Sequence, residues 1–104
     1  NRISQEEAKH FAQRLIGQGN LESALRQLNR ADSRDHGWYY LHGVILMGMR
    51  RYEEAHDSFR EAVKAEPENR EYRAKALEAA VAMKNSHRLD VKVQNWFKDT
   101  FGRK

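Results

Sequence analysis

The sequence contains no cysteine and only one proline, and each absence excludes a class of structure. Without cysteine, neither a disulfide framework nor a thiolate zinc site can form. Pro67 is the single proline, strand signals are nearly absent, and no Asn-Gly or Asp-Gly turn separates alternating segments. No apolar run approaches the ~20 residues that a membrane-spanning helix needs. The sequence therefore predicts an all-helical domain without a transmembrane segment.

The motifs of a catalytic site are also missing from the sequence. There is no HExxH pair, no glycine-rich phosphate loop, no nucleophile elbow and no paired-carboxylate constellation. The histidines do not form an i, i+4 pair on any expected helix, and without cysteine a zinc site would need distant partners. The five histidines are His10, His36, His42, His56 and His87. We therefore expect no enzyme activity, no cofactor and no metal.

Positive charge is concentrated at the C-terminus. The formal net charge is +4, yet residues 1–83 hold 13 basic and 13 acidic side chains. Residues 84–104 hold six basic side chains and two acidic ones. A basic end of this kind can bind nucleic acid or an anionic membrane surface, or it can be a solvated helix face. We favour the solvated face and keep the binding role as the alternative.

The 104 residues correspond to one domain, 1–104, with a modest core. Because the chain starts at Asn1 and not at a methionine, we expect it to be a fragment of a longer protein. No secretory signal is visible, and we favour a cytoplasmic location.

Periodic apolar residues and capping signals divide the chain into six expected helices. Ser4 and Glu7 form a capping box at the first start, Gly19 and Pro67 mark two of the ends, and Asn85-Ser86 marks the last break. The short connections between helices predict three antiparallel hairpins. The expected pairs are 4–18 with 20–31, 36–49 with 51–66, and 70–84 with 87–101.

The second and fourth expected helices repeat one another. Residues 19–31 align with residues 50–62 without a gap. The alignment pairs Leu21 with Tyr52, Ala24 with Ala55, Leu28 with Phe59 and Ala31 with Ala62. Because small residues recur where two helices must approach closely, we expect Ala24 and Ala55 to be buried.

This pattern resembles the tetratricopeptide repeat family, whose ~34-residue unit has a small residue in its first helix, A-x3-F in its second and a closing proline. Gly43, Ala55-x3-Phe59 and Pro67 match these positions. The repeats would span about 5–35, 36–69 and 70–101. The third is degenerate, with Leu77 where the second has Gly43. The resemblance implies a right-handed superhelical stack of three antiparallel hairpins, a TPR-like α-solenoid. The alternative fold is an irregular helix bundle.

The resemblance also implies a concave groove that binds a partner. At 100° per residue, Tyr40, Val44 and Met47 form one stripe, which would give the groove an apolar centre with charged flanks. The candidate groove residues are Lys9, Gln13, Tyr40, Val44, Met47 and Lys75. We expect a scaffold, adaptor or chaperone-like module that binds an apolar segment of a protein or peptide, with the two lysines selecting acidic partners. Nucleic acid and membranes are not the expected partners.

The last expected helix has one apolar face, formed by Leu89, Val93, Trp96, Phe97 and Phe101. We expect this face to pack on helix 70–84 as the cap of the stack, because a bare end of a repeat array exposes core. Two alternatives remain open. The helix could fold back over the stripe of Tyr40 and Met47, or it could lie on a membrane surface as a basic amphipathic helix.

Overall fold

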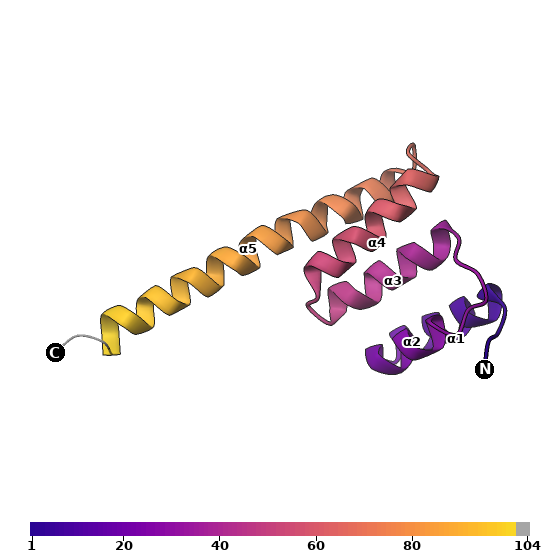
Figure 1. Cartoon of the computed structure of the whole chain (residues 1–104), viewed down its shortest axis with the longest axis horizontal. Helices are drawn as coiled ribbons and strands as arrows, with labels where there is room; N and C mark the ends of the chain where they lie inside the picture. Colours follow the sequence, from indigo (N-terminus) through magenta and orange to yellow (C-terminus); the bar gives the residue numbers. More distant parts are fainter. Residues whose placement is uncertain (102–104) are drawn as a thin grey trace.

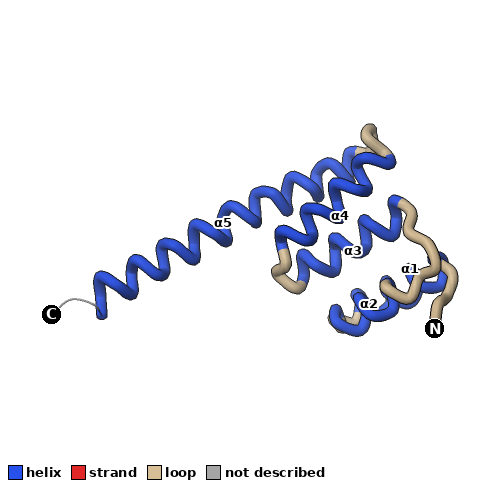
Figure 2. Tube along the Cα trace, in the orientation of Figure 1, coloured by secondary structure: helices blue, strands red, loops and turns tan. Residues whose placement is uncertain are grey.

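The computed structural model describes the backbone of residues 1–101 and the side chains of residues 1–86. Five helices follow one another (Figures 1 and 2). They are α1 (Gln5–Gly17), α2 (Leu21–Leu28), α3 (His36–Gly48), α4 (Tyr52–Ala65) and α5 (Arg70–Phe101). Within residues 1–101 there is no strand, and one isolated bridge joins Ile3 to Ala31. The all-α prediction is confirmed.

Each helix packs on the next one along the chain, so the molecule is an elongated stack of 61 × 31 × 20 Å. Helices α1 and α2 form one hairpin, α3 and α4 form a second, and α5 runs along α4 (Figure 1). Helix α3 also contacts α1 and α2, which joins the two hairpins. The first two predicted pairs, 4–18 with 20–31 and 36–49 with 51–66, are confirmed, with shifts of one to three residues at the helix ends.

The turns inside the two hairpins have the same backbone geometry. Gly19 and Arg50, which the alignment pairs, both have a positive φ, 75° and 63°. In each turn the N–H of the following residue donates to the carbonyl oxygen five positions earlier, at 2.9 Å in both cases. Arginine rarely adopts this conformation, which costs an L-residue about 1–2 kcal/mol. The gapless alignment at an offset of 31 therefore corresponds to a repeated turn.

Helices α1, α3 and α5 start in the same way. Ser4, Asp35 and Asn69 each accept a hydrogen bond from the N–H three residues further on, at 3.2, 2.9 and 3.1 Å. Such side-chain caps satisfy backbone donors that the first turn of a helix leaves without a partner. The caps lie 31 and 34 positions apart, so α5 starts where the first helix of a third repeat is expected.

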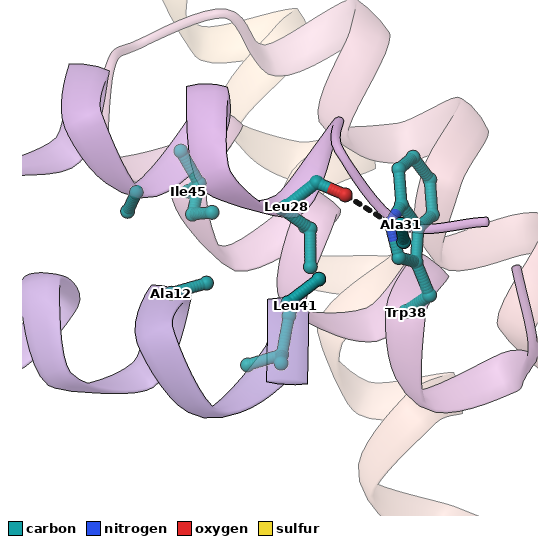
Figure 3. Close-up of a cluster of buried hydrophobic side chains, with 8 residues drawn as sticks. Ala12, Leu28, Ala31, Trp38, Leu41 and Ile45 are labelled. Atoms are coloured by element: carbon teal, nitrogen blue, oxygen red, sulfur yellow. Dashed lines mark hydrogen bonds between the residues drawn. The ribbon is translucent and has the colours of Figure 1, made fainter. Parts of the chain in front are cut away.

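The first core cluster joins α1, α2 and α3 around Trp38 (Figure 3). The indole N–H of Trp38 donates to the carbonyl oxygen of Leu28 at 2.8 Å, across the connection between the hairpins. Ala12, Leu28 and Ile45 are fully buried beside it. A buried tryptophan needs a partner for its N–H, and the end of α2 supplies one.

The second core cluster joins α3, α4 and α5. Phe59 lies at its centre, with Leu46, Ala55 and Ala79 around it. A Cβ built on Gly43 would lie 2.5 Å from the ring of Phe59, so this ring occupies the space that any other residue at position 43 would need. Ala24 and Ala55 are both fully buried, as predicted.

The third predicted hairpin is wrong. Helix α5 is continuous for 32 residues, and the break expected at Asn85-Ser86 is absent. No glycine or proline lies between residues 70 and 101, and both polar residues are tolerated inside a helix at a cost below about 1 kcal/mol each. A separate sixth helix therefore neither caps α5 nor covers the stripe of Tyr40. The predicted apolar face starting at Leu89 lies outside the described side chains.

The close approach at Gly43 predicts the effect of one added methyl group. Gly43→Ala should lower the free energy of unfolding by ~1–3 kcal/mol, because the ring of Phe59 must move. Helix propensity alone would favour alanine by about 1 kcal/mol, so a loss would show that overpacking dominates. The matched control is Gly17→Ala, since a Cβ at this position meets nothing within 4 Å. Urea unfolding of both variants measures the difference, and equal midpoints would contradict the contact.

Candidate functional site

Two hollows lie along the side of α3 that carries Tyr40 and Met47. The first, of about 370 Å³, lies between α1 and α3. Its lining residues are Glu6, Lys9, His10, Gln13, Gly37, Tyr40 and Leu41. Three of the predicted groove residues, Lys9, Gln13 and Tyr40, therefore come together.

The second hollow, of about 560 Å³, lies between α3 and α5. Its lining residues are Met47, Ala74, Leu77, Glu78, Val81, Ala82 and Asn85. Of the predicted groove residues only Met47 is among them. Val44 is half-buried and packs on the second core cluster, and Lys75 lies outside both linings. Because Tyr40, Val44 and Met47 are four and three residues apart, both hollows lie on one side of α3.

Tyr40 connects α3 to α5. Its hydroxyl donates a 2.6 Å hydrogen bond to Glu71, and its ring stacks on Tyr72 with centroids 5.1 Å apart. Burial and the acceptor carboxylate of Glu71 raise the pKa of Tyr40 to about 12, so the hydroxyl stays protonated at neutral pH. Tyr40 therefore lies between the two hollows as a structural residue, and its hydroxyl group already has a hydrogen-bond partner.

Lys9 is held by the residue that caps α3. Its ammonium group lies 2.9 and 3.2 Å from the two carboxylate oxygens of Asp35. Burial by itself would raise the pKa of Asp35, but hydrogen bonds from Lys9 and from the Trp38 N–H lower it below its ordinary value. The pair ties α1 to the start of α3, 26 positions along the chain.

The expected charged flanks are internally balanced. Lys75 lies 3.5 Å from Glu78 on α5, and Lys9 is paired with Asp35. Neither lysine therefore presents an isolated positive charge, and the selection of acidic partners by the two stays a prediction. The surface is distinguished by its apolar residues.

Leu77 and Val81 are apolar wall residues that are absent from the predicted groove residues. Their exposed fractions are 66% and 48%, and they lie one helical turn apart in the wall of the α3–α5 hollow. The sequence signal was the leucine at position 77, 34 residues after Gly43. In the structure this leucine is an apolar side chain that no described helix covers.

A partly buried polar pair lies on the other side of α3. The Nδ1 atom of His42 is 2.5 Å from the hydroxyl of Ser58, and its ring stacks on Trp38 at 4.6 Å between centroids. Burial, followed by the charge of Arg34, lowers the pKa of His42 to about 4, so the ring is neutral at pH 7. Within residues 1–86 no carboxylate is hydrogen-bonded to this histidine, so the pair bridges α3 and α4 and lacks the third member of a catalytic triad.

Neither a metal cluster nor a membrane span is found in the part of the chain that the structure describes. No three His, Asp or Glu side chains lie close enough to hold an ion. No helix there is both long and apolar enough to cross a membrane.

Comparisons with protein-family models, with curated proteins and with solved structures found no match. The resemblance to tetratricopeptide repeats therefore rests on the residues, turns and caps described above.

The His42–Ser58 pair predicts a pH dependence of stability. An unfolded imidazole has a pKa of about 6.5, so a folded value near 4 means that protonation favours the unfolded chain. The stability that the neutral ring contributes is complete above about pH 6.5 and is lost as the pH falls towards 4. Thermal unfolding at pH 7 and pH 4.5 should show a larger decrease in Tm for the native chain than for His42→Gln, which cannot titrate. Equal decreases in Tm for the two proteins would exclude the titration of His42 as the cause.

Proposed function

We propose that the chain is a protein-interaction module of the tetratricopeptide type, a scaffold or adaptor whose α1–α3–α5 side binds an apolar helical segment of a partner. The observation that carries this proposal is the apolar wall of the α3–α5 hollow. Met47, Leu77 and Val81 line it together, and two of the three are among the exposed large apolar residues of the described chain. Contiguous exposed apolar patches on soluble proteins usually mark interaction sites.

An amphipathic helix is the ligand shape that fits this surface. Such helices place side chains three and four positions apart into apolar grooves, and Leu77 and Val81 have the matching spacing on the receptor side. Met47 adapts its thioether to partners of different shape. The hydrogen bond from Tyr40 to Glu71 fixes α3 and α5 relative to each other, so the hollow exists before the partner arrives.

The repeat register supports the tetratricopeptide assignment. The turns at Gly19 and Arg50, and the caps at Ser4, Asp35 and Asn69, recur at offsets of 31 and 34 residues. In this proposal α1–α2 and α3–α4 are two complete repeats of a right-handed superhelical stack. Helix α5 starts as the first helix of a third repeat. No catalytic step is part of the proposal, since the sequence shows no catalytic motif.

One other function has an observation in its favour. The excess of four positive charges in residues 84–104 suits nucleic acid or anionic lipid. Most of this segment lies outside the described side chains. Salt separates the two functions, because phosphate contacts weaken steeply as salt rises and apolar contacts do not.

The position of the α3–α5 hollow predicts where a photoreactive label will capture a partner. The chain has no cysteine, so a photoreactive group can be attached at one introduced cysteine alone. A label on Asn85→Cys, beside the hollow, should capture a partner from native lysate, and the capture should persist at high salt. The matched control is Glu22→Cys, an exposed site on α2 that lines neither hollow.

A second substitution shows whether the apolar wall is responsible. Leu77→Glu in the Asn85→Cys background should weaken capture by at least about tenfold, the effect expected of a central interface residue. Because Leu77 is two-thirds exposed, the variant should keep its helical circular dichroism spectrum. Two outcomes would support the charged C-terminal segment as the binding site. One is equal capture by the labels at Asn85→Cys and Glu22→Cys. The other is capture that is unchanged by Leu77→Glu and is lost at high salt.

A further inference from the structure

Helix α5 is more than twice as long as the helix on which it packs. Its 32 residues span about 48 Å, and the 14 residues of α4 span about 21 Å. The C-terminal half of α5 therefore extends beyond α4 and away from both hairpins (Figures 1 and 2). An isolated helix of about 15 residues is marginal in water, so a helical half of this length gains stability from a packing partner.

The α3–α5 hollow lacks the corresponding helix. At the offset of 34 residues, Leu77 stands where Gly43 stands in the second repeat, and Gly43 is covered by Phe59 from α4. Nothing in the described chain covers Leu77 in the same way, and two-thirds of its surface is exposed. The sequence assigns that covering role to residues 87–101, which in this structure continue α5.

The sequence of residues 87–101 has the chemistry that the hollow accepts. Leu89, Val93 and Trp96 recur at helical spacing, and one basic residue, Lys92, lies between Leu89 and Val93. The single charged residue among those lining the α3–α5 hollow is acidic, Glu78. Because Glu78 already lies 3.5 Å from Lys75, the complementarity between the segment and the hollow is apolar. Without a glycine or proline between residues 70 and 101, the segment has no turn by which to reach the hollow of its own copy.

We propose that residues 87–101 of a second copy occupy the α3–α5 hollow, so that the chain forms a two-fold dimer by exchanging this segment. The inference rests on the proposed function, in which the hollow binds an amphipathic helix. It identifies that helix as residues 87–101 of a second copy. Each copy offers one hollow and one segment, so two identical contacts close the dimer and leave neither part without a partner. An antiparallel pairing of the two α5 helices centred near residue 87 places Val81 of one copy beside Val93 of the other.

The absence of cysteine permits a direct test. In Val81→Cys/Val93→Cys, the two introduced residues are twelve positions apart on one helix, about 18 Å. A disulfide needs Cα atoms about 4.4–6.8 Å apart, so the bond can form within one copy only if the helix turns back. We expect disulfide-linked dimers on a non-reducing gel. A mixture of the two single variants should also give dimers, and each single variant alone should not.

The control mixture pairs Val93→Cys with Glu22→Cys, which should give no specific dimer. Disulfide-linked monomer would show that the segment folds back on its own copy and would overturn the proposal. Absence of any disulfide would overturn it as well.

Light scattering on the native 104-residue chain provides the second measurement. We expect a mass near twice 12.2 kDa, and Leu77→Glu should raise the dissociation constant at least about tenfold. The matched control is Phe11→Glu, a change of the same kind at an exposed apolar residue in a hollow between α1 and α2. A monomer at all concentrations would refute exchange. If Leu77-dependent capture at Asn85→Cys persisted in that case, the hollow would still be a binding site, occupied by another protein.

Discussion

The arrangement of α3, α4 and α5 depends on the contact between Gly43 and Phe59. Because Gly43 has no Cβ, the ring of Phe59 lies directly against the backbone of α3, and the two helices of the second hairpin approach closely. The same ring contacts the cluster that contains Ala79, so it also sets the position of α5. A leucine occupies the equivalent position in α5. This helix therefore accepts another helix only at a greater distance, and the result is an open apolar surface around Leu77.

Polar contacts hold this arrangement and thereby decide which groups remain for a partner. The pair Lys9–Asp35 ties α1 to the start of α3, and the Tyr40–Glu71 hydrogen bond ties α3 to α5. Each contact stabilises the surface but removes a charge or a hydroxyl from recognition. Met47, which lines the α3–α5 hollow, contributes no strong polar group. For the proposed helical ligand, affinity at this surface would therefore come from apolar burial, at roughly 25 cal/mol per Å², with charge setting orientation.

The sequence was sufficient wherever local chemistry determines structure. The cap at Ser4, the turn at Gly19 and the burial of Ala55 follow from short patterns, and the structure confirms them. The predicted break at Asn85-Ser86 is wrong because these two residues only weakly disfavour a helix. No glycine or proline interrupts α5 there. The Lys9–Asp35 and His42–Ser58 pairs join residues 26 and 16 positions apart. Their pairing depends on how α1, α3 and α4 are placed, which periodicity alone does not determine.

Segment exchange would make partner binding depend on concentration. If residues 87–101 of a second copy occupy the hollow, any other helix must displace them, and its apparent affinity falls as the dimer accumulates. At low concentration the dimer would dissociate, and the hollow and residues 87–101 would separate from each other. Both parts then become available to other proteins together. In this proposal, one leucine at the position equivalent to Gly43, on a helix without a glycine or proline, would couple self-association to recognition.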